Sequence, residues 1–584
     1  MDDADLPQLV VLATTWRDAD PDPRTRREID LLIEQLTGGD QASRTAARDD
    51  LAQRFAGTLS FGTAGLRGAL GAGPNRMNRA VVIRAAAGLA AHLNGTISGE
   101  PPVVVVGYDA RHDSDVFARD SCAVFAAAGC VPMLLPGPLP TPVLAFALRH
   151  LGADAGVMVT ASHNPPQDNG YKVYLGGRAD TSPGSGAQIV PPADERIAGR
   201  IAAAPKAIDV PMTTGGWEVL PTEIVEHYLD AVCSFVDPDA PHAIDIVVTP
   251  LHGVGGETAV RAFSRAGFPV PHLVSEQAEP DPDFPTVSFP NPEEPGAMDL
   301  AVASARSRGA QLVIANDPDA DRCAVAVPDP KASGGRGWRT LRGDEVGSLL
   351  GEYLLTRNPR PGTASTGPRT VASSIVSSQL LSRIAQAHGD RHVETLTGFK
   401  WLSRVPDLYY AYEEALGYCV APDVVRDKDG ISAALLVAEL AAGLLVQGRT
   451  LLDALDDLAH RHGLHATDQF SVRVDDLSRI AKMLQRLRDQ PPEQLGGALV
   501  SSNEDLGLGQ GGLPPTDGLR YRTTDEARVI VRPSGTEPKL KVYLEVVVPV
   551  GAEASALAAA RSTAAQRLAA LRQDVAAALG VELD

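Results

Sequence analysis

Short apolar runs alternate with amphipathic stretches over most of the first 465 residues. PVVVVGYD at 102–109, VPMLLPG at 131–137 and AGVMVTAS at 155–162 are apolar enough to form buried strands. The stretch that follows Asp113, and TPVLAFALRHLG at 141–152, separate these runs and have a helical pattern. Alternation of this kind predicts a mostly parallel sheet with helices on both faces.

The same alternation of strands and helices occurs twice more along the chain. IDIVVTPLHGVGG at 244–256 and GAQLVIAN at 309–316 predict strands of a second block, and TVASSIV at 370–376 and LYYAYEEA at 408–415 predict strands of a third. Beyond about residue 465 the chain becomes rich in β-type runs and closes with an Ala-rich helix, which predicts an α+β domain.

Four domains are expected, because 584 residues are too many for one hydrophobic core. We predict three similar α/β domains with mostly parallel sheets and a C-terminal α+β domain, arranged around a central cleft. The boundaries are placed at residues 1–215, 216–330, 331–465 and 466–584. Residues 24–56 are charged and helical in pattern, and they precede the first block.

Composition narrows the choice of partners and compartment. Asp and Glu total 73 against 53 Lys and Arg, and the net charge of −20 disfavours nucleic acid and anionic membranes. The longest apolar stretch, ISAALLVAELAAGLLVQG at 431–448, is interrupted by Glu439 and predicts a buried helix. The five cysteines have no ligand spacing, and the acidic start lacks the basic region of a signal peptide. We therefore expect a soluble cytoplasmic protein.

DPDADR at 317–322 follows an apolar strand and carries three acidic residues in alternation. In extended backbone Asp317, Asp319 and Asp321 share one side, so their carboxylates can converge on one hard cation such as Mg²⁺ or Ca²⁺. An EF-hand is excluded, because Arg322 and Pro328 stand where that loop needs Gly and Glu. The alternative is a solvated acidic loop, but three aligned carboxylates without a cation repel one another.

Three further stretches carry candidate chemistry. TASHNP places Ser162 and His163 at a sharp turn, although the dipeptide alone is more typical of an ordinary polar loop. RPSGTEPK gathers Arg and hydroxyl side chains with Gly in one turn, which suits a phosphate dianion. YEEALGY sets Glu413 and Glu414 at a strand end, where they could contact sugar hydroxyls or form a solvated pair.

HGVGGET at 252–258 has some likeness to a dinucleotide-binding fingerprint. Thr258 occupies the sixth position, where that fingerprint needs Gly or Ala, so we interpret the stretch as a tight strand-to-helix turn. His252 is interpreted as a hydrogen-bonded turn residue.

The four motifs TASHNP, DPDADR, EEALG and RPSGTEP, in this order along nearly the whole chain, resemble those of the α-D-phosphohexomutase superfamily. The resemblance implies that Ser162 carries a phosphoryl group and completes the shell of a Mg²⁺ ion held by the three aspartates. It assigns catalytic or positioning roles to the following set: Arg67, His163, Lys172 and Lys428. It assigns substrate contacts to a larger set: Arg322, Thr397, Gly398, Lys400, Glu413, Glu414, Arg532, Ser534, Gly535, Thr536 and Lys539.

The implied activity is transfer of phosphate between C1 and C6 of a hexose phosphate, with a sugar 1,6-bisphosphate as activator and a sugar phosphate as the small-molecule partner. Ala415 replaces a serine that many glucose- and mannose-specific members carry, so phosphopentomutase remains an alternative, as does sugar-1,6-bisphosphate synthase. Other classes are a Mg²⁺-dependent phosphohydrolase with Asp317 as nucleophile, and an inactive sugar-bisphosphate sensor. The sequence predicts no oligomeric state.

Overall fold

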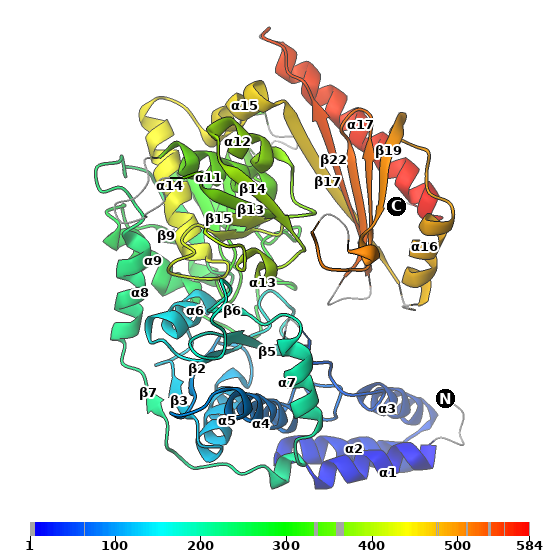
Figure 1. The fold of residues 1–584 in the computed structure, drawn as a ribbon. Helices are drawn as coiled ribbons and strands as arrows, with labels where there is room; N and C mark the ends of the chain where they lie inside the picture. Colours follow the sequence, from blue (N-terminus) through cyan, green and yellow to red (C-terminus); the bar gives the residue numbers. More distant parts are fainter. Residues whose placement is uncertain are drawn as a thin grey trace. The chain divides into compact units, whose positions relative to one another are not determined.

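The computed structural model describes residues 6–62, 65–331, 337–357, 367–474, 476, 478–509, 512–534, 539–553 and 555–582. It divides into two compact units. The first unit consists of Met1–Leu341, Ser403–Pro406 and Gly417–Gly443, and the second of Arg342–Leu402, Asp407–Leu416 and Leu444–Asp584. Figure 1 labels many of the elements of both units along the chain.

Three helices lead the first unit, α1 (Leu6–Asp18), α2 (Pro23–Gly38) and α3 (Gln41–Arg54), drawn in dark blue in Figure 1. The predicted helical segment 24–56 is thus two helices, because two glycines end α2 and Asp40 caps α3 by accepting a bond from Ser43 N at 2.8 Å. The helix α1 was not predicted. The three helices share a small apolar core.

The first sheet has the strand order β1-β5-β4-β2-β3-β7, with β6 paired to β5. The strands β2 (Val103–Tyr108), β3 (Val131–Leu134), β4 (Ala155–Val159) and β7 (Glu218–Val219) are parallel, as the alternation predicted. The strands β1 (Leu66–Ala69), β5 (Asp168–Leu175) and β6 (Ala187–Gln188) extend the sheet with antiparallel pairings. The helices of this block are α4 (Arg79–Thr96), α5 (Ser114–Ala127), α6 (Thr141–His150) and α7 (Ala193–Ala202), followed by a short 3₁₀ helix at Ala207–Asp209.

A second sheet of the first unit has the order β12-β11-β10-β8-β9. Its strands are β8 (Ile246–Thr249), β9 (His272–Leu273), β10 (Leu312–Ala315), β11 (Ala324–Pro328) and β12 (Trp338–Thr340). Its helices are α8 (Glu223–Cys233), α9 (Gly255–Arg265) and α10 (Asp299–Arg308), with a 3₁₀ helix at Ser275–Gln277. Because β10 pairs with β11 in antiparallel fashion, DPDADR forms the loop between two adjacent strands.

The second unit begins with an α/β block. It contains α11 (Gly343–Thr356), β13 (Thr370–Ser374), α12 (Leu380–His388), β14 (Arg391–Thr395), α13 (Phe399–Leu402) and β15 (Leu408–Glu413). The strands β14, β13 and β15 lie side by side and parallel. The next strand, β16 (Gly417–Cys419), and most of α14 (Gly430–Val446) belong to the first unit.

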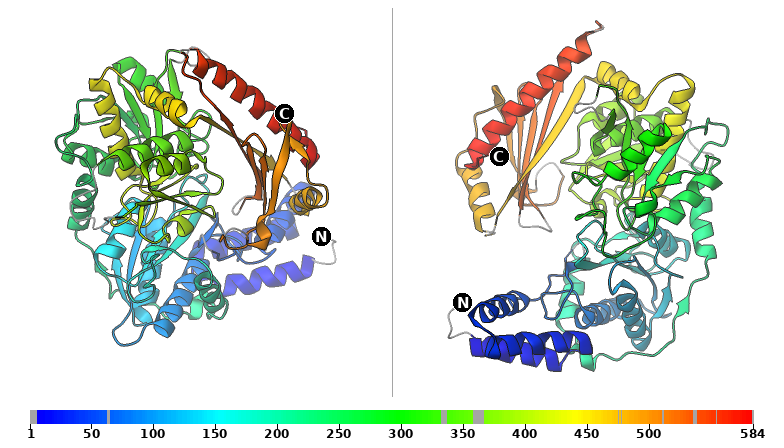
Figure 2. Two further views of the ribbon diagram at one scale, coloured as in Figure 1. Left: turned by 45° about the horizontal axis from the view of Figure 1, so that its top comes forward. Right: turned by 180° about the vertical axis from the view of Figure 1, so that it is seen from behind.

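The C-terminal part of the second unit is an antiparallel sheet with the order β17-β22-β21-β20-β19-β18. Its strands are β17 (Leu464–Arg473), β18 (Gln494–Leu495), β19 (Ala498–Asp505), β20 (Leu519–Thr523), β21 (Arg528–Pro533) and β22 (Lys539–Val548). The helices are α15 (Leu451–His462), α16 (Ser478–Asp489) and α17 (Ala556–Leu579), with a 3₁₀ helix at Leu506–Leu508. One face of this sheet packs on α16 and α17, and Figure 2 shows α17 lying along it.

Within the described ranges no single helix has the length and apolar character needed to cross a membrane, although the bent pair α14 and α15 meets that test by length and composition. Glu439 of α14 is buried and accepts a bond from the backbone N–H of Asp237 at 3.1 Å. The polar residue that interrupts the apolar stretch therefore has a partner inside the protein.

Candidate active site

Ser162 lies just beyond the carboxyl end of β4, at a turn where its own φ is +52°. Its N–H donates to Thr160 Oγ1 at 2.8 Å, which holds the turn in this left-handed conformation. The hydroxyl donates to Asp317 Oδ2 at 2.7 Å and lies 3.2 Å from His163 Nδ1. The structure therefore brings the serine of TASHNP to the aspartates of DPDADR, which the sequence separates by 155 residues.

Arg111 fixes the backbone of this turn. Its guanidinium is buried, and it donates to the carbonyl oxygens of Ser162 at 2.6 Å and Pro165 at 2.8 Å. Asp109, 3.4 Å from Arg111 Nε, supplies the compensating charge. Sequence reasoning did not identify Arg111. The available signal was its place just after β2, because β2 and β4 are parallel neighbours whose carboxyl ends meet at one edge.

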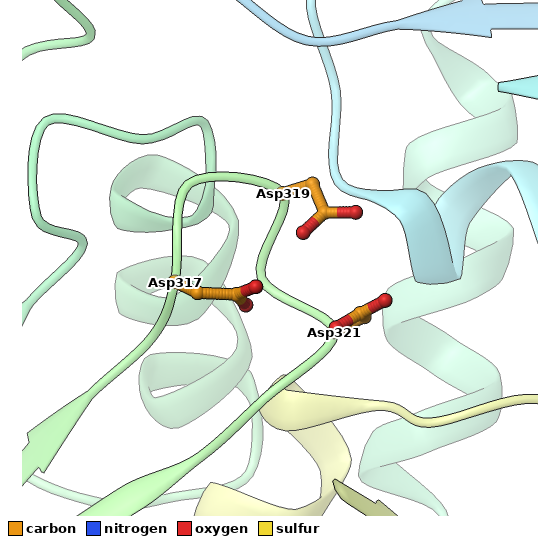
Figure 3. Close-up of side chains that lie close together, drawn as sticks. All are labelled: Asp317, Asp319 and Asp321. Carbon is orange, nitrogen blue, oxygen red and sulfur yellow. The ribbon is translucent and has the colours of Figure 1, made fainter. Parts of the chain in front are cut away.

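The three aspartates converge as predicted (Figure 3). All are buried, and one ligand atom from each lies within 4.8 Å of the others. The loop is closed at Ala320, which has a φ of +54°. Asp319 Oδ1 and Asp321 Oδ1 are buried and have no hydrogen-bond partner among the described residues. Buried carboxylate oxygens without partners fit a hard divalent cation such as Mg²⁺ or Ca²⁺.

Two lysines neutralise part of this acidic cluster. Lys172 Nζ lies 2.7 Å from Asp319 Oδ2 and 2.8 Å from Asp321 Oδ2, and Lys428 Nζ lies 3.2 Å from Asp321 Oδ2. Burial alone would raise the pKa of Asp321, but the two ammonium groups outweigh it and hold that pKa below its ordinary value. Burial and the neighbouring carboxylates instead raise the pKa of Asp317.

The loop is supported from outside by the HGVGGET turn. Val254 N–H donates to the carbonyl oxygen of Pro318 at 2.9 Å. A Cβ on Gly253 would lie 2.4 Å from the same oxygen, so only glycine fits this approach. His252 Nε2 lies 2.8 Å from Thr286 Oγ1, in agreement with its interpretation as a turn residue.

Thr141 supplies a further contact, donating from Oγ1 to Asp319 Oδ2 at 2.6 Å. Sequence reasoning missed this residue, whose only signal was its place at the start of a helix.

Arginines flank the serine. Arg67, on β1, donates to Asn164 Oδ1 at 3.2 Å, and Arg322 Nε lies 3.8 Å from Asp317 Oδ2. Burial, followed by the positive charge of Arg322 and Arg67, lowers the pKa of His163 well below its ordinary value. Residues 63–64, which precede Arg67 in the stretch FGTAGLRG, lie outside the described residues.

Lys428 belongs to RDKDG, and both flanking aspartates are engaged. Asp427 accepts from Tyr174 Oη at 2.8 Å and from Gln188 Nε2 at 2.7 Å, while its Oδ1 lies 3.5 Å from Lys428 Nζ. Asp429 accepts from Tyr228 Oη at 2.9 Å. The loop that presents Lys428 is therefore fixed on both sides.

The predicted sugar-binding residues lie in the second unit. Glu413 ends β15, and Glu414 follows it. Glu414 Oε2 accepts from Ser374 Oγ at 3.1 Å and Ser377 Oγ at 3.2 Å, so this carboxylate is anchored to the segment after β13. Glu414 thus has a structural contact that the sequence did not reveal.

Two other predicted substrate loops belong to the same unit. Thr397 and Gly398, with a φ of +103° at the glycine, precede α13, which contains Lys400. At the turn between β21 and β22, Ser534 N–H donates to the carbonyl oxygen of Lys539 at 2.8 Å, two residues after Arg532. Gly535 and Thr536 lie outside the described residues. Each unit thus contains its own set of predicted site residues, and a single cleft that joins the two sets stays a prediction.

Four models of the phosphoglucomutase/phosphomannomutase family match the chain. Alpha/beta/alpha domains I, II and III match residues 58–208, 226–334 and 342–462, and the C-terminal domain matches residues 471–562. The domain boundaries given above stay predictions.

Named relatives and a solved structure agree with these matches. A probable phosphomannomutase of Haemophilus influenzae is 46% identical over 472 residues, which cover 80% of this chain and 93% of the relative. The human phosphopentomutase is 35% identical over 548 residues, covering 86% of this chain and 87% of the relative. The crystal structure of a putative phosphomannomutase from Thermus thermophilus shares the fold, with a TM-score of 0.67, 24% identity, and coverage of 89% of this chain and 99% of that one.

The matched domains and relatives define the class of protein as an isomerase that transfers phosphate, a phosphomutase. The chain belongs to the phosphoglucomutase/phosphomannomutase family of the α-D-phosphohexomutase superfamily. The expected superfamily and fold class are thereby confirmed.

Proposed function

We propose that the protein moves phosphate reversibly between C1 and C6 of a hexose phosphate, glucose or mannose, through a phosphoserine at Ser162 and a sugar 1,6-bisphosphate intermediate. The observation that carries this proposal is the 2.7 Å contact between Ser162 Oγ and Asp317 Oδ2, which sets a hydroxyl against a buried carboxylate cluster. The free sugar phosphate is the small-molecule partner, and the sugar 1,6-bisphosphate is the activator that first loads the serine.

Asp317, Asp319 and Asp321 would hold a Mg²⁺ ion, and an oxygen on Ser162 would be a fourth ligand. Bound there, the ion would supply positive charge beside the phosphoryl group. The fit rests on the buried, unpartnered oxygens of Asp319 and Asp321.

In the first transfer, the free hydroxyl oxygen of the sugar phosphate bonds to the phosphorus on Ser162, and the bond between Ser162 Oγ and phosphorus breaks. The hydroxyl proton passes to a basic group, for which His163 and the neutral form of Lys428 are the candidates, and Ser162 Oγ takes up a proton as it leaves, for which the Lys172 ammonium is the candidate donor. The bisphosphate then turns over, and its other phosphate returns to Ser162 in the reverse reaction. Arg67 and Arg322 stabilise charge on the moving group, because phosphoryl transfer depends mainly on alignment and neutralised charge.

The second unit supplies recognition in this proposal. Glu413 contacts sugar hydroxyls, and Arg532, Ser534, Gly535 and Thr536 hold the phosphate that does not react. A bidentate guanidinium and a hydroxyl donor suit a phosphate dianion. Thr397–Lys400 and Lys539 complete the set of substrate contacts.

A pentose phosphate is the second candidate substrate. Ala415 stands where many hexose-specific members have a serine, which removes one hydroxyl contact to the sugar. The 35% identity to a relative named phosphopentomutase favours the same candidate.

The experiment combines intact mass with kinetics. After incubation with glucose 1,6-bisphosphate, the protein should gain one phosphate, which glucose 1-phosphate removes, and Ser162→Ala should abolish both the gain and turnover. Ser234→Ala, at an exposed serine beyond α8, is the matched control and should behave as wild type. Full turnover by Ser162→Ala would contradict the proposal. Comparison of kcat/KM for glucose 1-phosphate, mannose 1-phosphate and ribose 1-phosphate then identifies the sugar.

A further inference from the structure

The first unit contains a long loop that belongs to none of the four motifs. Residues 278–298, named here the proline-rich loop, run from the 3₁₀ helix at Ser275–Gln277 to α10 without forming a helix or a strand. They contain six prolines. Loops of this length without secondary structure are uncommon in compact domains and usually have a function. Because proline fixes φ, this composition restricts the conformations available to the loop.

The loop begins on the turn that also supports the aspartates. Asp281 N–H donates to the carbonyl oxygen of His252 at 3.0 Å, and His252 Nε2 lies 2.8 Å from Thr286 Oγ1. Gln277 Nε2 donates to the same Thr286 hydroxyl at 2.9 Å. The HGVGGET turn therefore fixes the position of the proline-rich loop as well as that of DPDADR.

Phe284 joins the loop to the support of the serine turn. The guanidinium carbon of Arg111, which holds the backbone of Ser162, lies 4.9 Å from the centroid of the buried Phe284 ring. The φ of Phe284 is +47°, a left-handed conformation that is costly for an aromatic residue and persists only where the surroundings fix it. A ring placed against a guanidinium stabilises its charge. The strained conformation thus serves a contact next to the candidate active site.

The second half of the loop approaches two more residues of the site. The Phe289 ring lies 6.1 Å from the His163 ring, centroid to centroid, and Glu293 Oε2 lies 3.6 Å from Arg322 Nη1. Asn291, buried between them, donates from its N–H to the carbonyl oxygen of Phe289 at 2.8 Å. Its Oδ1 accepts from Glu293 N–H at 3.2 Å. This turn fixes the backbone from which the Glu293 carboxylate extends.

The Arg322 guanidinium lies between two carboxylates. Its Nη1 faces Glu293, and its Nε lies 3.8 Å from Asp317 Oδ2, the oxygen that also accepts from the Ser162 hydroxyl. Both distances are those of ion pairs without a hydrogen bond. The side chains of Arg322 and Glu293 are only 13% and 30% exposed, so their attraction is screened less than that of a surface pair. Without the Glu293 charge, the attraction of Asp317 would draw the guanidinium onto the carboxylate cluster.

We propose that Glu293 is a positioning residue, which holds Arg322 away from Asp317 so that its guanidinium faces the phosphoryl group on Ser162. This inference rests on the proposed function. Glu293 acts through Arg322 and contacts neither the sugar nor the moving phosphate. Because Arg322 stabilises charge that develops during transfer, the alignment of its guanidinium affects the rate of transfer and leaves the binding of the sugar phosphate unchanged.

The test uses the full-length protein and Glu293→Gln, which keeps the size of the side chain and removes its charge. Glu294→Gln is the matched control, because it removes the same charge one residue further along the loop. For each protein, kcat and KM are measured at saturating glucose 1,6-bisphosphate with the sugar 1-phosphate that the wild type converts fastest. Both substitutions are then repeated in an Arg322→Gln background.

We expect Glu293→Gln to lower kcat about tenfold and to leave KM within about twofold of wild type. Glu294→Gln should have the constants of the wild type. In the Arg322→Gln background, Glu293→Gln should cause no additional loss, since the residue through which Glu293 acts is already absent. A merely structural role would instead cause the same loss in both backgrounds.

Three results would overturn the inference: a wild-type kcat in Glu293→Gln, an equal loss in Glu294→Gln, or an equal loss with and without Arg322. A higher KM at unchanged kcat would also overturn it, because that result would assign Glu293 to binding of the sugar phosphate. A wild type that isomerises none of the sugar phosphates refutes the proposed function instead, so the two failures are distinguishable.

Discussion

Replacement of Asp344 by asparagine should change how the stability of the protein depends on pH. Asp344 lies in the first turn of α11, and its carboxylate accepts from Ser378 N–H at 2.6 Å and Tyr412 Oη at 3.1 Å. Burial, together with the negative charges of Glu414 and Glu545, raises the pKa of Asp344 from 3.8 to about 7. The neutral form of this side chain is therefore favoured in the folded protein.

The direction and size of this pH effect follow from the linkage between proton binding and folding. A carboxyl whose folded pKa exceeds its unfolded pKa adds stability below the unfolded value, and this contribution is lost as pH rises through the folded value, here between about pH 4 and 7. A shift of about three units at 1.36 kcal/mol per unit gives a loss of at most about 4 kcal/mol above pH 8. Asparagine keeps an acceptor oxygen and does not ionise, so Asp344→Asn avoids this loss.

The assay is urea denaturation followed by circular dichroism at pH 5, 6, 7 and 8 for wild type and Asp344→Asn. The free energy of unfolding of the variant should rise relative to wild type across this range. Asp505→Asn is the control, because bonding to Arg488 lowers the pKa of Asp505 and it stays ionised throughout. Parallel pH profiles for wild type and Asp344→Asn would refute the reasoning.

Two other perturbations test the packing and the metal. Gly343→Ala would place a Cβ 1.9 Å from the carbonyl oxygen of Glu414. We therefore expect the free energy of unfolding, measured by thermal unfolding, to fall by about 2 kcal/mol, and KM to rise. The control is Gly199→Ala in α7, which has open space around it and should raise the free energy of unfolding by up to about 1 kcal/mol. Mg²⁺ at 100 times its Kd should stabilise the wild type by about 2.7 kcal/mol relative to the EDTA-treated protein. The variant Asp319→Asn should lose most of this stabilisation. Equal stabilisation of the wild type and the variant by Mg²⁺ would argue against the aspartates as ligands.

The strands of the first block were predictable because β2 and β4 are buried on both faces and therefore have continuous apolar runs. The strand β5 was not predicted, since Asn169 and Lys172 lie buried inside it and interrupt the apolar pattern. A polar residue is buried there because it contacts the site, so local pattern and function conflict at this strand. The break between α2 and α3 was visible in the sequence as a Gly-Gly-Asp signal.

The candidate site was predictable where its chemistry is concentrated in one short stretch. The three aspartates converge, but on a loop that turns at Ala320 (φ +54°) and not on the extended backbone from which their alternation was interpreted. Arg111 and Thr141 were missed because their contacts to Ser162 and Asp319 join positions 51 and 178 residues apart. Neither residue belongs to a motif, and only the packing of parallel strand ends brings them to the site.

The division of the chain into two units also divides the predicted site residues between them. Ser162, the aspartate triplet and both compensating lysines belong to the first unit, where they form one hydrogen-bonded cluster. Glu413 and Glu414 of the predicted sugar loop, and Arg532 and Ser534 of the predicted phosphate loop, belong to the second unit. If the proposed function holds, a substitution in the second unit should alter which sugar is bound without disturbing the neutralised carboxylates. Under the proposed function, the residues that transfer phosphate and those that recognise the sugar are therefore carried by different units.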